Sequence, residues 1–282
     1  ADLGPQKHQW GQGSSPILHD DLCIIYHGPG EPSSVYALDK RTGKVRWQQS
    51  IPESDPEERF DGFAGKKSQP MGSFATPMVI KAGSRDELLL PISNKLRAHD
   101  PATGKELWFV DGLNPLVYSS TAYGEGLVVA MGGFFGSTFA VKPGGTGNVT
   151  PTRLWYEQRS KKHRICTPII KDGHIFVFNT IGFAECIELA TGKSIWDERI
   201  KASGAKGESW SSFVLAGDKL YGVNQSGDTI VLRASPKFEL IATNPLGEYS
   251  NSTPALSNGE IFLRTHQGLW CIGAAKTTAS AR

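Results

Sequence analysis

Hydrophobic residues along this chain of 282 residues fall into short runs that are separated by glycine, proline and small polar residues. The clearest runs cover residues 22–26, 88–91, 127–131, 175–178, 220–223 and 261–263. These runs are too short for helices, no helical periodicity is sustained, and glycine interrupts them. The pattern therefore predicts an all-β protein in which many short strands are joined by tight turns.

A motif that ends in tryptophan recurs along the chain and marks one kind of turn. Residues 37–47, 98–108 and 186–196 each contain a small residue, an acidic residue two positions later, the sequence Thr-Gly-Lys and a final tryptophan. Residues 140–155 give a looser version, with Lys142 at the acidic position. A carboxylate can cap a tight turn, and glycine supplies the positive φ that such a turn needs. We expect each copy to span a third strand, a turn and the start of a fourth strand.

A second recurring feature precedes the hydrophobic runs and sets the length of the repeat. A serine or threonine stands at residues 15, 76, 120, 167, 212 and 253, with intervals of 41 to 61 residues. A four-stranded propeller blade takes about 40 to 50 residues. The sequence thus predicts one β-propeller domain over residues 1–273, followed by a tail over residues 274–282. The domain would have about six four-stranded blades, which start near residues 14, 75, 119, 166, 211 and 252.

The first and last residues of the domain bear on how the propeller closes. The sixth repeat stops after its third strand, and residues 1–5 resemble the end of a fourth strand. Because closure removes exposed sheet edges, we expect residues 1–5 to complete the last blade and close the ring. The alternative is that these blades form part of a ring of seven or eight. Residues 54–73, a charged insertion, are expected to form a loop on one face.

The motif tryptophans have a structural interpretation. A large, flat side chain with one hydrogen-bond donor suits the seam between two blades. We therefore expect these residues to hold neighbouring blades together, and we exclude them from the candidate ligand-binding residues. They are Trp47, Trp108, Trp155 and Trp196.

The four cysteines, Cys23, Cys166, Cys186 and Cys271, lie among hydrophobic neighbours in predicted strands. They form neither a Cys-x-x-Cys motif nor an adjacent pair. We interpret them as buried thiols that act as small hydrophobic residues. Since clustered metal ligands are not found, the sequence predicts no metal site.

Charge and hydropathy exclude two classes of partner. The formal net charge of +2 at pH 7 gives no field that would favour nucleic acid or an anionic membrane. The densest basic run, residues 159–164, is interpreted as a solvated loop, with a polyanion contact as the alternative. No hydrophobic stretch is long enough to span a membrane as a helix. We expect a monomer that does not bind nucleic acid.

The tryptophan-ended motif resembles the tryptophan-docking motif of pyrroloquinoline-quinone-like (PQQ-like) propeller repeats. That superfamily includes quinoprotein alcohol dehydrogenases and the propeller lipoprotein of the outer-membrane β-barrel assembly machinery. Residues 244–247, 252–255, 261–265 and 269–273 are similar to the final repeat of a bacterial group called PQQ-binding-like β-propeller repeat proteins, and the likeness covers residues 8–273. The resemblance implies a propeller fold and a periplasmic or secreted location, but a fold does not determine a function.

Two sets of loops share one face of such a propeller. The D–A loops join the fourth strand of one blade to the first strand of the next, and the B–C loops join the second strand to the third. Exposed aromatic rings near hydrogen-bonding groups suit a flat or sugar-like ligand or a partner peptide. The alternative is that the rings only pack between the tops of the blades. The rim candidates are Trp10, Phe74, Tyr118, His163, Arg164, Trp210, Tyr249 and His266.

Three functions are compatible with these features. We favour a non-catalytic binding or interaction scaffold, whose partner is a protein or a glycan. The second is a carbohydrate-active lyase or hydrolase at the rim, for which Glu208, His163 and Arg164 are the only acid–base set that can be assembled. The third is a PQQ-dependent dehydrogenase. The resemblance implies adjacent cysteines and carboxylate ligands for calcium in such enzymes, and this chain lacks both patterns. PQQ and calcium are therefore not expected.

Overall fold

The structure is a computed structural model that describes residues 2–5, 8–30, 32–51, 71–204 and 207–274. Within these ranges it contains 26 strands and one short 3-10 helix, which confirms the all-β prediction. Six antiparallel sheets follow one another along the chain as blades 1 to 6. No helix in the described ranges is long and hydrophobic enough to cross a membrane.

The first three blades have four consecutive strands each. Blade 1 contains β1 (Ile17–His19), β2 (Leu22–His27), β3 (Ser34–Asp39) and β4 (Val45–Ser50). Blade 2 contains β6 (Met78–Ala82), β7 (Arg85–Ile92), β8 (Lys95–His99) and β9 (Glu106–Asp111). Blade 3 contains β11 (Ala122–Gly124), β12 (Leu127–Met131), β13 (Thr138–Val141) and β15 (Trp155–Glu157).

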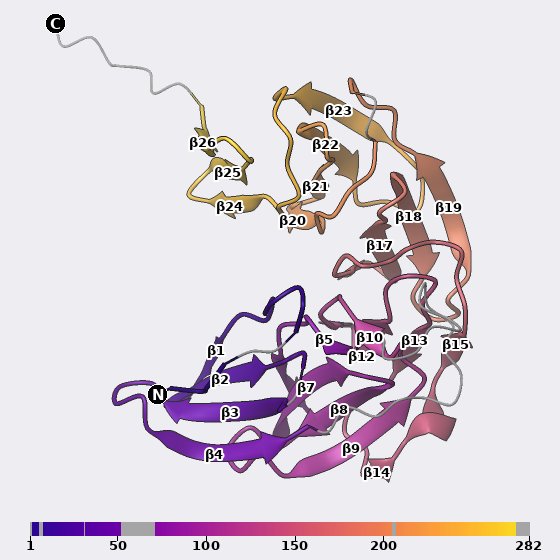
Figure 1. Cartoon of the computed structure of the whole chain (residues 1–282). Coiled ribbons are helices and arrows are strands. Elements are labelled where there is room, and N and C mark those ends of the chain that lie inside the picture. Colours follow the sequence, from indigo (N-terminus) through magenta and orange to yellow (C-terminus); the bar gives the residue numbers. More distant parts are fainter. Residues whose placement is uncertain (1, 6–7, 31, 52–70, 205–206, 275–282) are drawn as a thin grey trace, which may run out of the picture.

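The last three blades continue the pattern, except that blade 6 has only three described strands. Blade 4 contains β16 (Ile169–Lys171), β17 (His174–Phe178), β18 (Phe183–Glu188) and β19 (Ser194–Arg199). Blade 5 contains β20 (Val214–Ala216), β21 (Lys219–Val223), β22 (Asp228–Arg233) and β23 (Leu240–Pro245). Blade 6 contains β24 (Ala255–Ser257), β25 (Glu260–Arg264) and β26 (Leu269–Ile272). Figure 1 shows the blades around a central axis, with β1 innermost and β4 outermost in blade 1.

Three short strands lie outside the repeat. β5 (Gly72–Ser73) and β10 (Leu116–Val117) pair in parallel and so join two neighbouring D–A loops. β14 (Gly147–Asn148) pairs in parallel with β9 and adds a fifth strand to blade 2. The 3-10 helix η1 (Thr150–Thr152) follows β14. The segment after Lys142, expected only as a loose turn, therefore reaches back to the preceding blade.

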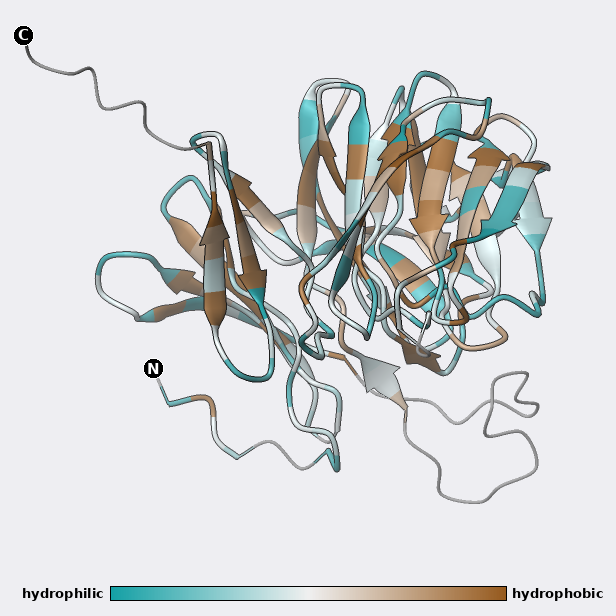
Figure 2. Ribbon diagram, turned by 90° about the horizontal axis from the view of Figure 1, so that it is seen from above, coloured by the Kyte–Doolittle hydropathy of each residue, from teal (hydrophilic) through white to brown (hydrophobic). Residues whose placement is uncertain are grey.

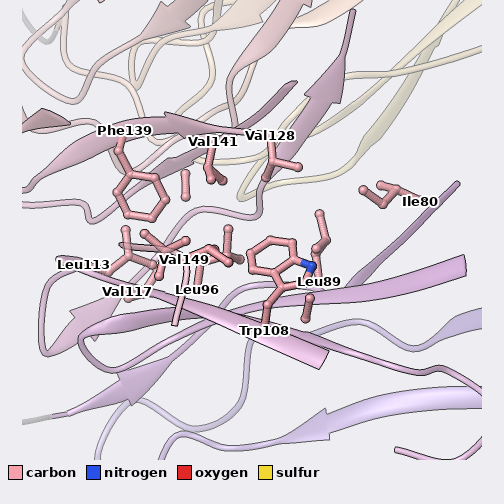
Figure 3. Packing of buried hydrophobic residues seen from close by; sticks show 13 residues of the cluster. Ile80, Leu89, Leu96, Trp108, Leu113, Val117, Val128, Phe139, Val141 and Val149 are labelled. Carbon is pink, nitrogen blue, oxygen red and sulfur yellow. The ribbon is translucent and has the colours of Figure 1, made fainter. Parts of the chain in front are cut away.

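Hydrophobic contacts between neighbouring blades form the core. Figure 2 shows hydrophobic residues along the strands and hydrophilic residues at many of the turns. Side chains of a strand alternate between the two faces of its sheet, so one blade can pack against a neighbour on each side. Figure 3 shows the cluster between blades 2 and 3, where Leu89, Leu96 and Trp108 lie near Val128, Phe139 and Val141.

Three of the motif tryptophans connect their blade to the next one. Their Nε1 atoms donate to main-chain carbonyls in the turn between the third and fourth strands of the following blade. The pairs are Trp47 with Pro101 (3.0 Å), Trp155 with Leu189 (2.8 Å) and Trp196 with Ser235 (3.1 Å). The Trp47 ring also lies against Gly104, where an added Cβ would come within 2.6 Å of it. The motif glycine is thus needed for its missing side chain as well as for its positive φ.

Trp108 makes a different contact because blade 3 has no tight turn to receive it. Its side chain is fully buried, and its Nε1 donates at 2.9 Å to Glu87 of its own blade. Glu87 also accepts the amide of Gly144, in the long turn of blade 3, at 3.3 Å. Arg85 lies 2.6 Å from the same carboxylate and compensates its charge. The departure from the motif around Lys142 therefore changes the contact between blades without removing it.

A line of hydrogen bonds at the start of the first strands connects all six blades. In five blades a backbone amide donates to the side-chain hydroxyl of the corresponding residue in the next blade, at 2.9 to 3.2 Å. These are the serine and threonine positions that define the repeat in the sequence. Each amide lies just before a strand, so it has no strand partner and is paired by the neighbouring blade instead. We call the six residues the hydroxyl belt: Ser15, Thr76, Ser120, Thr167, Ser212 and Thr253.

The structure differs from the expected closure of the ring. Residues 2–5 contain no strand, and the sheet of blade 6 ends at β26, so residues 2–5 do not supply its fourth strand. The Gly4 amide donates to the Asp2 carboxylate at 2.9 Å, and Gly4 has a φ of 82°. This segment therefore turns instead of extending. Figure 1 accordingly shows an open arc, with blades 1 and 6 at its two ends. Residues 52–70 of the expected face loop and residues 275–282 of the expected tail lie outside the described residues.

Two of the four cysteines are more accessible than the sequence suggested. Cys166 and Cys186 are buried, whereas Cys23 is partly exposed and Cys271 is exposed, and all four are free thiols. Cys23 lies on blade 1 and Cys271 on blade 6. The interpretation as buried thiols is wrong for these two because they lie at the ends of the open arc.

We expect Gly104→Ala to lower the free energy of unfolding more than Gly83→Ala. Both glycines have positive φ, 74° and 64°, so both substitutions carry the left-handed cost of about 1–2 kcal/mol. Only at Gly104 would the added Cβ meet the Trp47 ring, since nothing lies within 4 Å of it at Gly83. Urea unfolding of both variants measures the difference. Equal losses would contradict the docking role of Trp47.

We expect Ser120→Ala to destabilise the protein and Ser15→Ala to have little effect. The Ser120 hydroxyl accepts the Thr76 amide at 2.9 Å, and leaving that amide unpaired should cost about 1–2 kcal/mol. Ser15 is the first residue of the belt, and its hydroxyl accepts no amide from another described blade. Urea unfolding of the two variants makes the comparison. A neutral Ser120→Ala would show that the belt contributes nothing to stability.

Candidate functional site

Four aromatic residues of the rim stand next to a buried serine that fastens their loop. Three of these serines donate at 2.8 Å to a carbonyl near the end of the second strand of their own blade. The pairs are Ser119 with Met131, Ser209 with Val223 and Ser250 with Arg264. The fourth, Ser73, is fully buried and accepts the Ala75 amide at 3.1 Å. The serines therefore hold the loop segments that carry four aromatic residues: Phe74, Tyr118, Trp210 and Tyr249.

The aromatic rings form a continuous strip from the segment before blade 1 to the loop before blade 5. The ring centroids of Trp10 and Phe74 are 6.3 Å apart, and Phe74 stacks on Tyr118 at 5.8 Å. Phe134 meets Tyr118 edge-on at 5.3 Å and contacts His163 at 5.0 Å and Trp210 at 6.0 Å. These separations are usual for aromatic pairs. We call the six residues the aromatic strip: Trp10, Phe74, Tyr118, Phe134, His163 and Trp210.

The two tryptophans at the ends of the aromatic strip are the accessible members. Trp10 is 52% exposed and Trp210 is 43% exposed, whereas Phe74, Tyr118 and Phe134 are half-buried. The rings therefore pack against one another, which is one of the two expectations for the rim residues. The two end rings nevertheless keep a large accessible surface, so the aromatic strip can still contact a ligand or partner.

Burial favours the neutral form of the histidine in the aromatic strip. Burial holds the pKa of His163 below its usual value, and the same cause lowers the pKa of His8, which lies 5.3 Å from Phe74. A neutral imidazole in contact with Phe134 acts as one more aromatic ring. The strip thus offers flat hydrophobic surface and no fixed charge of its own.

Beside Trp210, polar groups gather around the side-chain amide of Gln225. With its nitrogen directed at Glu208, the amide donates to that carboxylate at 3.1 Å. Its oxygen then accepts from Trp210 Nε1 at 3.2 Å and from the Tyr249 hydroxyl at 2.8 Å. The Tyr249 ring in turn lies 4.5 Å from His266. Tyr249 and His266 therefore connect to the aromatic strip through Gln225.

Arg164 is buried, and its side chain has a structural role in an ion pair. It is only 5% exposed, and its guanidinium donates to Glu185 at 2.8 Å and to Thr138 at 3.2 Å, and also to Glu157. Glu185 is fully buried and accepts a further bond from Asn179 at 2.8 Å. Burial opposes ionisation of Glu185, but the adjacent Arg164 and other donors hold its pKa below the usual value.

The three residues proposed as an acid–base set have separate environments. Glu208 contacts Gln225, His163 lies against Phe134, and Arg164 is paired with Glu185. No hydrogen bond joins any two of these three in the part of the chain that the structure describes. The structure therefore does not assemble them into a proton-transfer constellation.

Two residues that connect the site, Phe134 and Gln225, lie in B–C loops, which sequence analysis placed on the same face as the D–A loops, although neither is among the eight rim candidates. Gly133, with a φ of 105°, lies so close to Tyr118 that a Cβ would come within 2.5 Å of that ring. This close approach brings Phe134 against its neighbours.

The residues present do not fit a calcium-bound quinone. Across the described ranges, no group of three or more His, Cys, Asp or Glu side chains could hold a metal ion. The buried carboxylates are satisfied by the protein: Glu87 by Trp108 and Arg85, and Glu185 by Arg164. Five of the six belt residues use their hydroxyls to accept an amide, and none of the six offers a carboxylate.

Comparison with solved structures shows the same architecture in proteins of distant sequence. BamB from Moraxella catarrhalis has a TM-score of 0.65 and 13% identity, over 91% of this chain and 70% of that one. Quinohemoprotein alcohol dehydrogenase from Comamonas testosteroni has a TM-score of 0.63 and 14% identity, over 90% of this chain and 51% of the enzyme. The C-terminal WD40 domain of Sif2 has a TM-score of 0.62 and 10% identity, over 88% of this chain and 65% of that domain. The chain thus spans about half the length of the dehydrogenase. At these identities the likeness concerns the fold.

Sequence comparison gives a narrower result. No curated protein matches the chain. A family model described as outer membrane protein assembly factor BamB matches residues 31–279, which is most of the sequence. The matched range includes all the tryptophan-ended motifs, and the blades that contain them have the expected propeller arrangement. The chain therefore belongs to the family of the outer membrane protein assembly factor BamB, a family of PQQ-like β-propellers.

Proposed function

We propose that this chain is a non-catalytic binding propeller and that the aromatic strip holds an extended segment of a partner protein. The observation that carries the proposal is the continuity of the strip from Trp10 to Trp210, with both end rings open to solvent. Membership of the BamB family is consistent with a scaffold role. By the same likeness we propose a periplasmic or secreted location.

The chemistry of the face suits a polypeptide. Tryptophan and tyrosine are the side chains that most often dominate protein interfaces, because they bury large areas at low cost in side-chain entropy. The polar groups around Gln225, next to Trp210, can pair with main-chain amides and carbonyls of a bound segment. Because the aromatic strip is uncharged and the net charge is small, hydrophobic burial would supply most of the affinity.

No observation favours the alternative of a carbohydrate-active hydrolase or lyase. Such a reaction needs an acid and a base at a common position. Arg164 forms a buried ion pair with Glu185, and Glu208 accepts a hydrogen bond from Gln225. A glycan partner remains an outcome that the binding experiment distinguishes.

Trp210→Ala should weaken binding of a peptide partner by about tenfold or more, as expected when an interface loses a large exposed tryptophan. The probe is a set of peptides selected from a random display library on the immobilised wild-type chain. Their affinities for wild type and variant are measured by titration, and a glycan array is screened in parallel.

Trp270→Ala is the matched control for this measurement. Trp270 lies on β26, away from the aromatic strip, and at 41% it is about as exposed as Trp210. It should retain wild-type affinity. Peptides that bind both variants equally would refute the proposed site, and glycans that bind in place of peptides would refute the protein partner.

Glu185→Gln should lower the free energy of unfolding by about 3–5 kcal/mol, since it leaves the buried Arg164 without its main counter-charge. Glu239→Gln is the control, because Glu239 pairs with Arg233 at an exposed position and should change stability little. Urea unfolding of both variants provides the numbers. A Glu185→Gln protein as stable as wild type would contradict the role of Glu185 as the stabilising counter-charge of Arg164.

A further inference from the structure

The exposed carboxylate of Glu208 lies at the rim beside the aromatic strip, without a positively charged partner. Its hydrogen-bond donor is the neutral side-chain amide of Gln225, at 3.1 Å. The ion pairs between described residues do not include Glu208. Other accessible carboxylates of the molecule do have such a partner, as Asp111 has Lys95 at 3.0 Å. Glu208 is therefore available to pair with a cation that another molecule brings.

The basic residues of the neighbouring D–A loop do not neutralise Glu208, because they are already paired. Lys162 lies 3.2 Å from the carboxylate of Glu185 and also pairs with Asp197. Arg164 pairs with the same Glu185 at 2.8 Å. Among the described residues, the loop before blade 4 thus has matched charges, whereas the loop before blade 5 carries an unmatched negative charge.

The position of Glu208 is fixed by its neighbours. Gln225 is only 7% exposed, and its main-chain amide donates to the Glu208 carbonyl at 2.8 Å while its side-chain amide donates to the Glu208 carboxylate. The next residue, Ser209, donates to the carbonyl of Val223 on the second strand at 2.8 Å. A carboxylate that is held in this way loses little further freedom when a ligand binds, and this favours binding.

Two aromatic side chains adjoin the same amide. Trp210 Nε1 and the Tyr249 hydroxyl both donate to the side-chain oxygen of Gln225, so these two groups and the Glu208 carboxylate surround one amide. Because its N–H is already paired, Trp210 offers a ligand the face of its ring, and the side chain is 43% exposed. The face of an aromatic ring carries partial negative charge and attracts cations. The carboxylate and the ring therefore favour the same kind of ligand.

We infer that the partner segment places an arginine or lysine side chain against Glu208 and the ring of Trp210, an inference that rests on the proposed binding of a polypeptide. A guanidinium suits this place well, because it pairs with a carboxylate through two parallel N–H bonds and stacks on an aromatic ring. Hydrophobic contact along the aromatic strip is not directional. A basic residue held at one end would fix the register and the direction of the bound segment.

A metal ion is a poorer occupant of this place than a basic side chain. Hard cations require several oxygen ligands at short range. In the ranges that the structure describes, no group of three or more His, Cys, Asp or Glu side chains could supply them, and Glu208 stands among amide and aromatic groups. A guanidinium or ammonium group needs only the one carboxylate and the ring.

The test uses peptides selected from the random display library on the wild-type chain. Each peptide is compared by titration with a neutral copy, in which citrulline replaces arginine or acetyl-lysine replaces lysine. We expect wild type to bind the charged peptide about tenfold more tightly than the neutral copy. In Glu208→Gln this preference should fall to about twofold, because the new side chain can still accept the Gln225 N–H but carries no charge.

Glu198→Gln is the matched control, because Glu198 is exposed on β19 and its substitution changes the net charge equally. It should keep the wild-type preference. Selected peptides without a basic residue, or the same preference in Glu208→Gln as in wild type, would overturn the inference and leave the proposed binding of a polypeptide in place. A library that yields no binding peptide would instead overturn the proposed function, and the inference with it.

Discussion

The hydroxyl belt is the interaction on which the arrangement of blades depends. A blade can bury its hydrophobic faces against a neighbour at many relative angles, because hydrophobic contact is not directional. The hydrogen bond from each pre-strand amide to the next blade's hydroxyl removes this freedom, since it fixes one point of every blade relative to the next. The tryptophan contacts at the outer strands fix a second point. Together they define both the spacing and the orientation of the blades.

This framework explains why an aromatic surface can be built from loops. The belt places the start of each first strand, and the serine just before it ties the D–A loop to the second strand of the same blade. The aromatic neighbour of each serine then has little freedom. Rings that are distant in sequence, such as Tyr118 and Trp210, become members of one strip because a serine in each loop donates to the second strand of its blade.

The sequence was most informative where a feature repeats. The strand runs, the tryptophan-ended motif and the pre-strand serines and threonines each occur several times, so a propeller and its approximate blade number could be predicted. Most of the candidate rim residues could be assigned to one face for the same reason. Closure could not be predicted, because residues 2–5 have a local alternative: the Asp2 carboxylate pairs with the Gly4 amide and favours a turn.

Features that occur once were the ones that sequence analysis missed. Arg164 stands in a basic run that suggested a solvated loop, yet its counter-charge, Glu185, is contributed by a strand 21 residues later in the sequence. Neither residue carries a local sign of burial. In the same way, β14 consists of two exposed residues whose strand conformation depends on the edge that β9 offers. Such pairings follow from tertiary structure and leave no periodic trace.

The belt connects the blades in series, and this has a consequence for how the protein unfolds. Among the described residues the belt joins each blade to the one before and the one after, so the described arc resembles a linear array of repeats. In such an array the end units are held from one side and open first, while the middle units are held from both. In the arc that the structure describes, the belt holds blades 2 to 5 from both sides and blades 1 and 6 from one side. A ring has no ends, and its blades would unfold together or not at all.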